Sequence, residues 1–205
     1  MIAERNNINV FVSSTVYDFE NTLDDIYTLL DTYGYDVLMS HKGTIPLDSH
    51  KSNLENCLEA VRKSDVFVGI IRPLRGSGVL ERDGKSITEY EFEEAFKMNI
   101  PRFILVDRDV EFARRFLKCM NIPYDKIPYE VVKHKGGQDV MVKNEVLHST
   151  SIGMYEMAIR SNLPPVARVG NWVQSYHNFD DIRMHLESQF QYVSWIKKLM
   201  EYGKQ

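Results

Sequence analysis

The segment Asp65-Val66-Phe67-Val68-Gly69-Ile70-Ile71 decides the fold class, because every residue after the first is apolar or glycine. A strand with one face in water alternates polar and apolar residues. A strand covered on both faces is apolar almost throughout. The segment therefore predicts a central strand of a parallel sheet that lies between two layers of helices.

Strand-like and helix-like segments alternate on both sides of this segment. The helix-like segments repeat their apolar residues every three or four positions, and the strand-like ones are short and rich in β-branched residues. This alternation predicts an α/β fold, a parallel sheet with helices on both faces and right-handed crossovers. The expected strands are residues 8–12, 35–39, 65–71 and 101–107, and the expected helices between them are residues 17–33, 54–61 and 86–98.

The second half of the chain has a weaker pattern. Helices are expected at residues 109–120 and 146–159, with a turn at Gly136-Gly137 between them. Asn178 has the character of a helix N-cap, and apolar residues then recur at helical spacing to Met200, which predicts one final helix. We therefore expect an α/β domain at residues 1–132 and a mainly helical extension at residues 133–205, packed on it as one structural unit.

The composition excludes several classes of function. The chain has 205 residues and a net charge of -4, so it lacks the general basic field of a nucleic-acid-binding protein. Its two cysteines and six histidines show no metal-ligand spacing, and we expect no metal site. Because no apolar run is long enough to span a bilayer and no secretory signal is visible, we expect no membrane partner and a cytoplasmic location.

Glu91 is an acid at a position where the helical pattern calls for an apolar residue. At about 100° per residue, Ile87, Ala95 and Met98 fall on one arc of the helix, and Glu91 falls inside that arc. An inward carboxylate is costly unless it is paired, neutral or directed into a cleft. Glu91 is therefore a catalytic group beside a crevice, a buried acid paired with an arginine such as Arg72, or an acid that reaches a backbone amide as a cap.

Three segments are expected beside Glu91, at residues 13–18, 41–48 and 72–84, because ligand crevices in such sheets lie outside the carboxyl ends of the strands. Two of these loops carry candidate ligand-binding groups. In the first, Ser13-Ser14-Thr15 follows the first strand and offers hydroxyls to a phosphate. The alternative for Ser14 or Thr15 is a cap on the following helix. The loop lacks the glycines of a dinucleotide fingerprint and the lysine of a P-loop.

The second loop is Arg72-Pro73-Leu74-Arg75-Gly76-Ser77-Gly78, which follows the central strand. Arg72 and Arg75, together with Gly76, Ser77 and Gly78, could hold an anionic ligand, because arginine carries a planar guanidinium group suited to phosphate. The alternative is a surface loop in which one arginine pairs with a nearby acid. Both interpretations remain open from the residues alone.

Three stretches together resemble a family of TIR-like domains that occur alone in bacteria or at the N-terminus of innate-immunity NTPase and repeat proteins. They are Val10-Phe11-Val12-Ser13-Ser14-Thr15, the run from Asn56 through Ser64-Asp65-Val66 to Ile70, and Ser86-Ile87-Thr88-Glu89-Tyr90-Glu91. The resemblance covers about residues 8–107 and implies a TIR or flavodoxin-like fold. The family is also distantly similar to nucleoside deoxyribosyltransferases.

The resemblance implies a role for Glu91. TIR enzymes carry Trp-Cys-x-x-Glu at the corresponding helix, and the deoxyribosyltransferases carry Gly-Thr-x-x-Glu. Thr88 keeps the threonine-to-glutamate spacing here, which places the family's catalytic glutamate at Glu91 and Thr88 in the substrate site. Ile87 and Thr88 stand where the tryptophan and cysteine would be, and the glycine before the threonine is absent.

The leading hypothesis is a TIR-like enzyme that cleaves or cyclises NAD+ as its substrate and uses no separate cofactor. Glu91 would stabilise the ribosyl cation, while Ser13, Thr15, Arg72 and Arg75 would hold the pyrophosphate. The resemblance also implies homo-oligomers and a nucleotide product that signals to an effector in antiviral defence. Two alternatives are a non-catalytic interaction module that self-associates and a nucleoside deoxyribosyltransferase.

Overall fold

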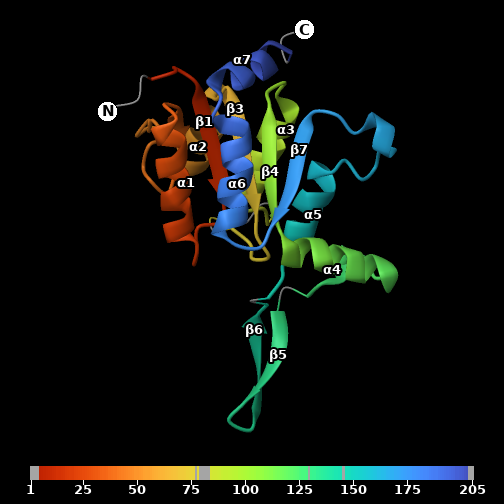
Figure 1. Ribbon diagram of the computed structural model, residues 1–205. Helices are drawn as coiled ribbons and strands as arrows, with labels where there is room; N and C mark the ends of the chain where they lie inside the picture. The colour runs from red at the N-terminus through yellow and green to blue at the C-terminus, as the bar shows by residue number, and fades with distance from the viewer. Residues whose placement is uncertain (1–4, 77, 79–83, 129, 145, 203–205) are drawn as a thin grey trace.

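The computed structural model describes residues 5–76, 78, 84–128, 130–144 and 146–202. Its centre is a five-stranded, fully parallel sheet with the order β2-β1-β3-β4-β7, which is the flavodoxin-like order (Figure 1). The α/β fold predicted from the sequence is confirmed. The strands of this sheet are β1 (Asn9–Ser14), β2 (Asp36–Leu38), β3 (Val66–Ile71), β4 (Arg102–Asp107) and β7 (Asn171–Tyr176).

Helices cover both faces of the sheet, as the apolar β3 required. On one face α1 (Glu20–Thr32) and α6 (Phe179–Phe190) pack on the sheet, and α7 (Val193–Tyr202) contributes Ile196 to the same core. On the other face lie α2 (Asn53–Lys63), α3 (Ile87–Lys97) and α5 (Ser149–Ala158). All six residues of β3 are buried, so the central strand separates two apolar cores.

Two local features of the sequence set the position of α3, the helix that carries Glu91: one sets its first residue and the other sets its distance from the sheet. Ser86 and Glu89 form a reciprocal capping box, which sets the first residue of α3 at Ile87. Further along, the Phe92 ring lies against Gly69 of β3. A Cβ at Gly69 would come within 2.5 Å of that ring, so only glycine permits this approach of α3 to the sheet. The inward face of α3 is therefore held closely over the end of β3.

The segment from residue 108 to residue 170 connects β4 to β7 and contains elements that the sequence did not predict. After α4 (Arg108–Cys119) and the short helix η1 (Tyr124–Lys126), the chain forms a hairpin of β5 (Glu130–Lys135) and β6 (Gln138–Lys143). The predicted turn at Gly136-Gly137 is confirmed and joins these strands, with both glycines at positive φ. The hairpin projects away from the sheet in Figure 1.

The extension predicted at residues 133–205 is not only helical, because β7 pairs with β4 along its whole length. β7 is the edge strand and keeps polar residues at Asn171, Gln174 and Ser175. Such an edge strand lacks the continuous apolar run that marks a central one. The fifth strand of the sheet thus comes from the part of the chain that the sequence predicts to be mainly helical.

The predicted final helix is two helices, α6 and α7. Asn178 caps α6 as expected, because its side chain accepts a hydrogen bond from the backbone N–H of Asp181 at 3.0 Å. Phe190 and Ile196 are both buried, yet six residues in one helix would separate them by about 240° around the axis. The break after Phe190 returns Ile196 to the core side.

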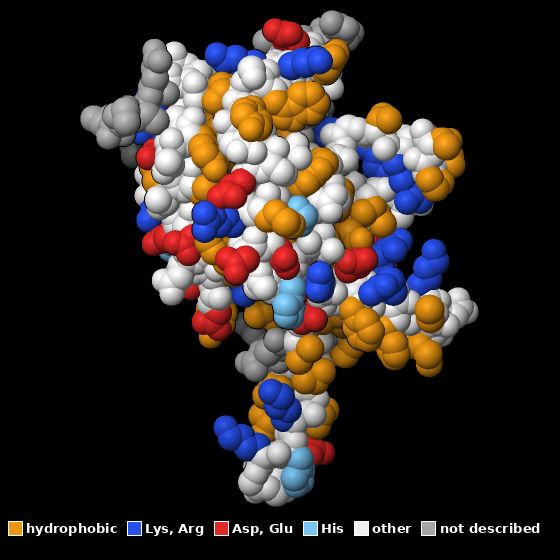
Figure 2. All heavy atoms as spheres, viewed as in Figure 1, with side chains coloured by type: hydrophobic (Ala, Val, Ile, Leu, Met, Phe, Trp, Pro, Cys, Tyr) orange, Lys and Arg blue, Asp and Glu red, His pale blue; other side chains and the backbone are white. Residues whose placement is uncertain are grey.

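The outer face of α4 is apolar and exposed. Phe112, Phe116 and Met120 follow one another at intervals of four residues, and each is more than half exposed. Figure 2 shows hydrophobic side chains gathered over α4 beside the base of the hairpin. Within the described part of the chain, no helix is both long enough and apolar enough to cross a bilayer.

Candidate functional site

A cavity lies at the carboxyl ends of the strands, beside the point where the strand order reverses. The chain passes from β1 outward to β2, and then back across β1 to β3, so the ends of β1 and β3 diverge there. Ligands in open parallel sheets bind at such a reversal. The cavity has a volume of about 270 Å³ and is lined by Ser14, Thr15, Val16, Ser40, Gly43, Ile45, Leu47, Asn53, Cys57, Ile87, Thr88 and Glu91.

Glu91 is buried in the wall of this cavity, with 4% of its surface exposed. The Ser13 hydroxyl donates a hydrogen bond of 2.5 Å to its Oε2, and the Cys57 thiol also hydrogen-bonds to the carboxylate. Burial raises the pKa of Glu91 to about 7, although both hydrogen bonds act to lower it. Near neutral pH the carboxyl is therefore divided between its protonated and ionised forms.

No arginine pairs with Glu91 among the residues that the structure describes, so the paired-acid alternative is not what the structure contains. Ser13 and Cys57, its partners, are uncharged. Burial, with the nearby Glu91 charge as a smaller contribution, raises the pKa of the Cys57 thiol to about 12. The thiol therefore keeps its proton at neutral pH and acts as a donor to the carboxylate.

The three hydroxyl residues after β1 have different roles. Ser13 contacts Glu91, whereas the Ser14 hydroxyl donates to the carbonyl of Thr15 at 3.1 Å. The Thr15 hydroxyl donates to the carbonyl of Leu74 at 3.3 Å, which ties the end of β1 to the loop after β3. Neither Ser14 nor Thr15 caps α1, whose N-cap is Phe19. Ser14 and Thr15 line the cavity, as predicted.

The predicted role of Arg72 and Arg75 at the cavity is not what the geometry shows. Arg72 donates to the carbonyls of Thr15 and Tyr17, and its guanidinium lies over the Phe19 ring at 4.4 Å. It therefore acts as a brace between the β1 and β3 loops. No lining residue of the cavity is an arginine in the described part of the chain.

Arg75 is held by the capping box of α3. Its Nε and Nη2 both lie 3.2 Å from Oε2 of Glu89, the oxygen that also accepts from the backbone N–H of Ser86. The guanidinium is drawn to the carboxylate at the start of α3 and away from the cavity. The surface-loop alternative, in which an arginine pairs with a nearby acid, is the one that the structure contains.

Gly76 and Thr88 meet at the start of α3. A Cβ at Gly76 would lie 2.6 Å from the Thr88 hydroxyl oxygen, so glycine is required for the loop to pass here. Thr88 itself is buried and lines the cavity, as the resemblance implied. Gly76 supports the cavity without lining it. Ser77, also predicted to contact substrate, lies outside the described residues.

Sequence reasoning missed the part of the site that α2 supplies, whereas it predicted residues 41–48 of the loop after β2 as a crevice segment. Asn53 and Cys57 lie one turn apart on α2, so their spacing places both side chains on the same side of that helix. Ser40, Gly43 and Ile45 come from the loop at the carboxyl end of β2, where a crevice residue is expected. Only the contact between Cys57 and Glu91, which the sequence does not indicate, identifies α2 as a wall of the site.

The cavity wall has one ionisable acid and no cation within the part of the chain that the structure describes. No group of three or more histidine, cysteine, aspartate or glutamate residues in the described ranges is arranged to hold a metal ion. Glu91 is thus the group with chemical reactivity in the cavity, and the remaining wall is apolar or made of neutral hydrogen-bonding groups. The arrangement suits an uncharged or positively charged part of a ligand.

The strand order and the position of the cavity define the protein as a flavodoxin-like α/β protein with a candidate site at the β1–β3 reversal. The family model described as "Domain of unknown function (DUF4062)" matches residues 9–121, and the chain belongs to this family. The match extends from β1 through α4 and includes every residue that lines the Glu91 cavity.

Five chains of solved structures match this chain. One of them is the "Crystal structure of conserved protein from Enterococcus faecalis V583", with 12% sequence identity and a TM-score of 0.43, and the alignment covers 88% of this chain and 98% of that one. No curated protein matches the chain.

Proposed function

We propose that the protein is a TIR-like enzyme that cleaves the nicotinamide N-glycosidic bond of NAD+. One observation carries the proposal: Glu91 is a buried carboxyl without a cationic partner among the described residues, and it lies in the wall of a cavity at the β1–β3 reversal. Keeping such a group costs stability, and strongly perturbed acids beside clefts are typical of functional sites. The resemblance of Thr88 and Glu91 to the catalytic motif of TIR enzymes supports the same assignment.

In the proposed reaction, the bond between C1′ of the ribose and the nicotinamide nitrogen breaks. The bonding electrons move to the ring nitrogen, which neutralises the pyridinium, and a ribosyl oxocarbenium cation remains. The ionised Glu91 carboxylate stabilises that cation in the low-dielectric cavity. Water then adds to C1′ and loses its proton, with Glu91 as the nearest base, to give ADP-ribose and nicotinamide. Attack by a group of the same nucleotide in place of water gives a cyclic product.

The raised pKa of Glu91 is compatible with a positively charged substrate, because such a substrate would favour the ionised carboxylate. Burial raises its pKa to about 7 in the empty cavity. A pyridinium ring beside the carboxyl favours the ionised form and lowers this pKa. Substrate binding therefore produces the catalytic carboxylate, and activity is expected to rise as the pH increases through about 7.

The cavity has a volume of about 270 Å³, which suits the nicotinamide and its ribose. The pyrophosphate would lie beyond the residues that line the cavity in the described part of the chain. Because Arg72 and Arg75 have other partners and do not line the cavity, the lining hydroxyls of Ser14 and Thr15 would accept hydrogen bonds from the substrate while they donate to backbone carbonyls. We further propose, from the resemblance alone, that the enzyme acts as a homo-oligomer and that its nucleotide product signals to an effector in antiviral defence.

A nucleoside deoxyribosyltransferase is the second candidate. It is favoured by the absence of lysine and arginine from the described cavity wall, which suits an uncharged nucleoside. In that reaction Glu91 attacks C1′, a covalent glycosyl-enzyme forms as the base leaves, and a second base then displaces the carboxylate. Both candidate functions use Glu91 and cleave an N-glycosidic bond at C1′. They differ in the substrate, which is NAD+ for the first and a deoxynucleoside for the second.

The test is to incubate the protein at several concentrations with NAD+ and, separately, with pairs of deoxynucleosides and free bases, and to measure released nicotinamide and exchanged base by chromatography. We expect nicotinamide release that falls about a hundredfold or more in Glu91→Gln. Glu93→Gln is the matched control, because its carboxylate is two residues away and pairs with Lys85 at the surface. It should retain wild-type activity.

The outcomes separate the functions. Base exchange without nicotinamide release would replace the first proposal with the transferase. Nicotinamide release that persists in a folded Glu91→Gln variant would refute the role of Glu91. No turnover in either assay at high protein concentration would support the non-catalytic interaction module.

A further inference from the structure

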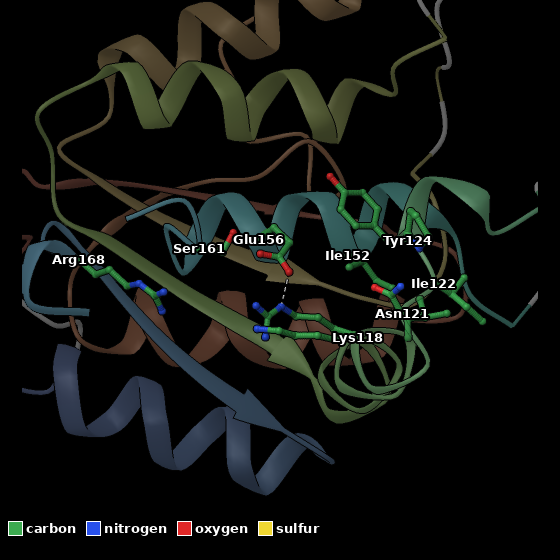
Figure 3. Close-up of a pocket in the computed structure, with 11 residues that line it drawn as sticks. Lys118, Asn121, Ile122, Tyr124, Ile152, Glu156, Ser161 and Arg168 are labelled. Carbon is green, nitrogen blue, oxygen red and sulfur yellow. Dashed lines mark hydrogen bonds and ion pairs between the residues drawn. The ribbon is translucent and has the colours of Figure 1, made fainter. Parts of the chain in front are cut away.

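A second cavity, with a volume of about 410 Å³, lies between α4 and α5 and shares no lining residue with the Glu91 cavity. Figure 3 shows Arg168 toward one end of it, Tyr124, Asn121 and Ile122 toward the other, and Glu156 and Ser161 between. Its wall is formed by Arg114, Leu117, Lys118, Asn121, Ile122, Pro123, Tyr124, Ile152, Glu156, Ser161 and Arg168.

The ends of two helices build this cavity. Asn121 follows α4 with a φ of 55°, and Arg160 follows α5 with a φ of 48°. The residue after each one donates a backbone hydrogen bond to a carbonyl five residues earlier: Ile122 to Leu117 at 2.9 Å, and Ser161 to Glu156 at 3.1 Å. These hydrogen bonds turn the chain back beside each helix. They also satisfy helix-end carbonyls that would otherwise oppose an anion.

The charges of the cavity favour an anion although the whole chain has a net charge of -4. Arg114, Lys118 and Arg168 are the cations of the wall, and Glu156 is its one acid among the described lining residues. The Arg114 Nε donates to Glu156 at 2.5 Å, so these two charges compensate each other. The wall then has two more cations than acids, Lys118 and Arg168, and no described acid lies within ion-pair distance of either one. The Lys118 charge also contributes to lowering the pKa of Glu156, and the Arg168 Nε donates to the carbonyl of Leu163 at 2.9 Å, which leaves its terminal nitrogens for an anion.

The other end of the cavity suits a flat, largely apolar ring. Leu117, Ile122 and Ile152 provide an aliphatic wall, and the ring of Tyr124 packs beside Gly153 of α5. The Asn121 amide offers one donor group and one acceptor, which is the combination that the edge of a nucleobase requires. The cavity is thus apolar with amide contacts at one end and cationic at the other.

We propose that this cavity binds a nucleoside monophosphate, with the base against the ring of Tyr124 and the phosphate at Lys118 and Arg168. The volume lies within the range of small-molecule sites. Charge-assisted hydrogen bonds from lysine and arginine provide most of the affinity for the phosphate, and burial of the base provides the remainder. The proposal does not depend on the function of Glu91, because the two cavities have no lining residue in common.

The test is calorimetric titration of the full-length protein with AMP, adenosine and inorganic phosphate at low ionic strength. AMP is expected to bind at least about tenfold more tightly than adenosine or phosphate. Lys118→Ala and Arg168→Ala should each weaken AMP binding about tenfold, because each removes one charge-assisted contact. Tyr124→Ala should weaken AMP binding and leave the weaker binding of phosphate unchanged. Lys197→Ala, at an exposed position of α7, is the matched control and should bind AMP as wild type does.

Three results would overturn the proposal. The first is the absence of AMP binding by a folded wild-type protein. The second is equal affinity for AMP and inorganic phosphate, which would remove the nucleoside. The third is AMP binding that survives both Lys118→Ala and Arg168→Ala but is lost in Thr88→Trp, which would place the nucleotide in the Glu91 cavity.

Discussion

The two cavities each contain one buried or half-buried glutamate, and the two carboxyls are in opposite states. Burial raises the pKa of Glu91 to about 7, and its partners Ser13 and Cys57 are uncharged. Burial would also raise the pKa of Glu156, but hydrogen bonds from Arg114 and Ser161 outweigh it and the pKa is lowered. The cations Arg114 and Lys118, with the Ser161 hydrogen bond, therefore keep Glu156 ionised, whereas Glu91 takes up and releases a proton near neutral pH.

The difference indicates what each cavity can do. In the second cavity Glu156 pairs with Arg114, and the described wall keeps a net positive charge that suits an anionic ligand. In the first, Glu91 has no such partner among the described residues, and its reactivity is retained. A carboxylate that is already paired with arginine is a poor stabiliser of a second cation, whereas an unpaired one is a good stabiliser of it.

The largest effect is expected for Glu91→Gln. The folded-state pKa of Glu91, about 7, lies above the ordinary value of 4.5, so the wild-type free energy of unfolding falls as the pH rises from about 4.5 to about 7 and is constant above that. At about 1.4 kcal/mol for each pH unit, the loss is about 3 kcal/mol. Denaturant unfolding at a series of pH values should show that this loss is absent in Glu91→Gln.

Glu93→Gln is the control for this experiment, since its surface ion pair with Lys85 leaves the interior unchanged. It should retain the wild-type pH dependence. If Glu91→Gln unfolds with the same pH dependence as the wild type, the carboxyl of Glu91 is not buried in its neutral form.

A smaller effect of opposite sign is expected for Glu156→Gln. The lowered pKa of Glu156 means that its pairing stabilises the fold at neutral pH, and that this contribution is lost as the pH falls through the lowered pKa. The free energy of unfolding of the variant should be about 1 kcal/mol lower than that of the wild type at pH 7, because the variant loses a charge-assisted hydrogen bond in a half-buried site. The difference should vanish in acid.

The matched control here is Glu187→Gln, which removes an exposed ion pair with Arg183 on α6 at 2.8 Å. Solvent screens such pairs, so the loss should be smaller than for Glu156→Gln. Equal losses in the two variants would mean that the second cavity does not protect its ion pair from water.

The smallest effect is expected for Ser13→Ala. The Ser13 hydroxyl stabilises the ionised form of Glu91, so its removal should raise the pKa of Glu91 further. The pH at which the free energy of unfolding becomes constant should move upward, and the activity profile proposed for Glu91 should move with it. Ser14→Ala should leave the pH dependence of unfolding unchanged, because the Ser14 hydroxyl bonds to a backbone carbonyl and not to Glu91.

The sequence predicts the sheet well where the residues are buried on both faces. The four strands of the first half are recognisable because apolar runs such as Val66–Ile71 have few alternatives to a central strand. β7 is missed because an edge strand tolerates polar residues, and its place beside β4 depends on contacts such as the hydrogen bond of 2.6 Å from Arg102 to Asn171. The pattern of apolar residues does not report on such a long-range contact.

The inward position of Glu91 is determined by the sequence alone, since helical periodicity fixes which face of α3 a residue occupies once the helix begins at Ile87. Only the tertiary structure determines which residues contact that face of α3 and which distant segments form the two cavities. It brings Cys57 to Glu91, draws Arg75 to Glu89, and joins α4 to α5 around the second cavity. The physical reason is range: periodicity and capping act within one helix, whereas charge pairing and desolvation depend on which distant segments pack together.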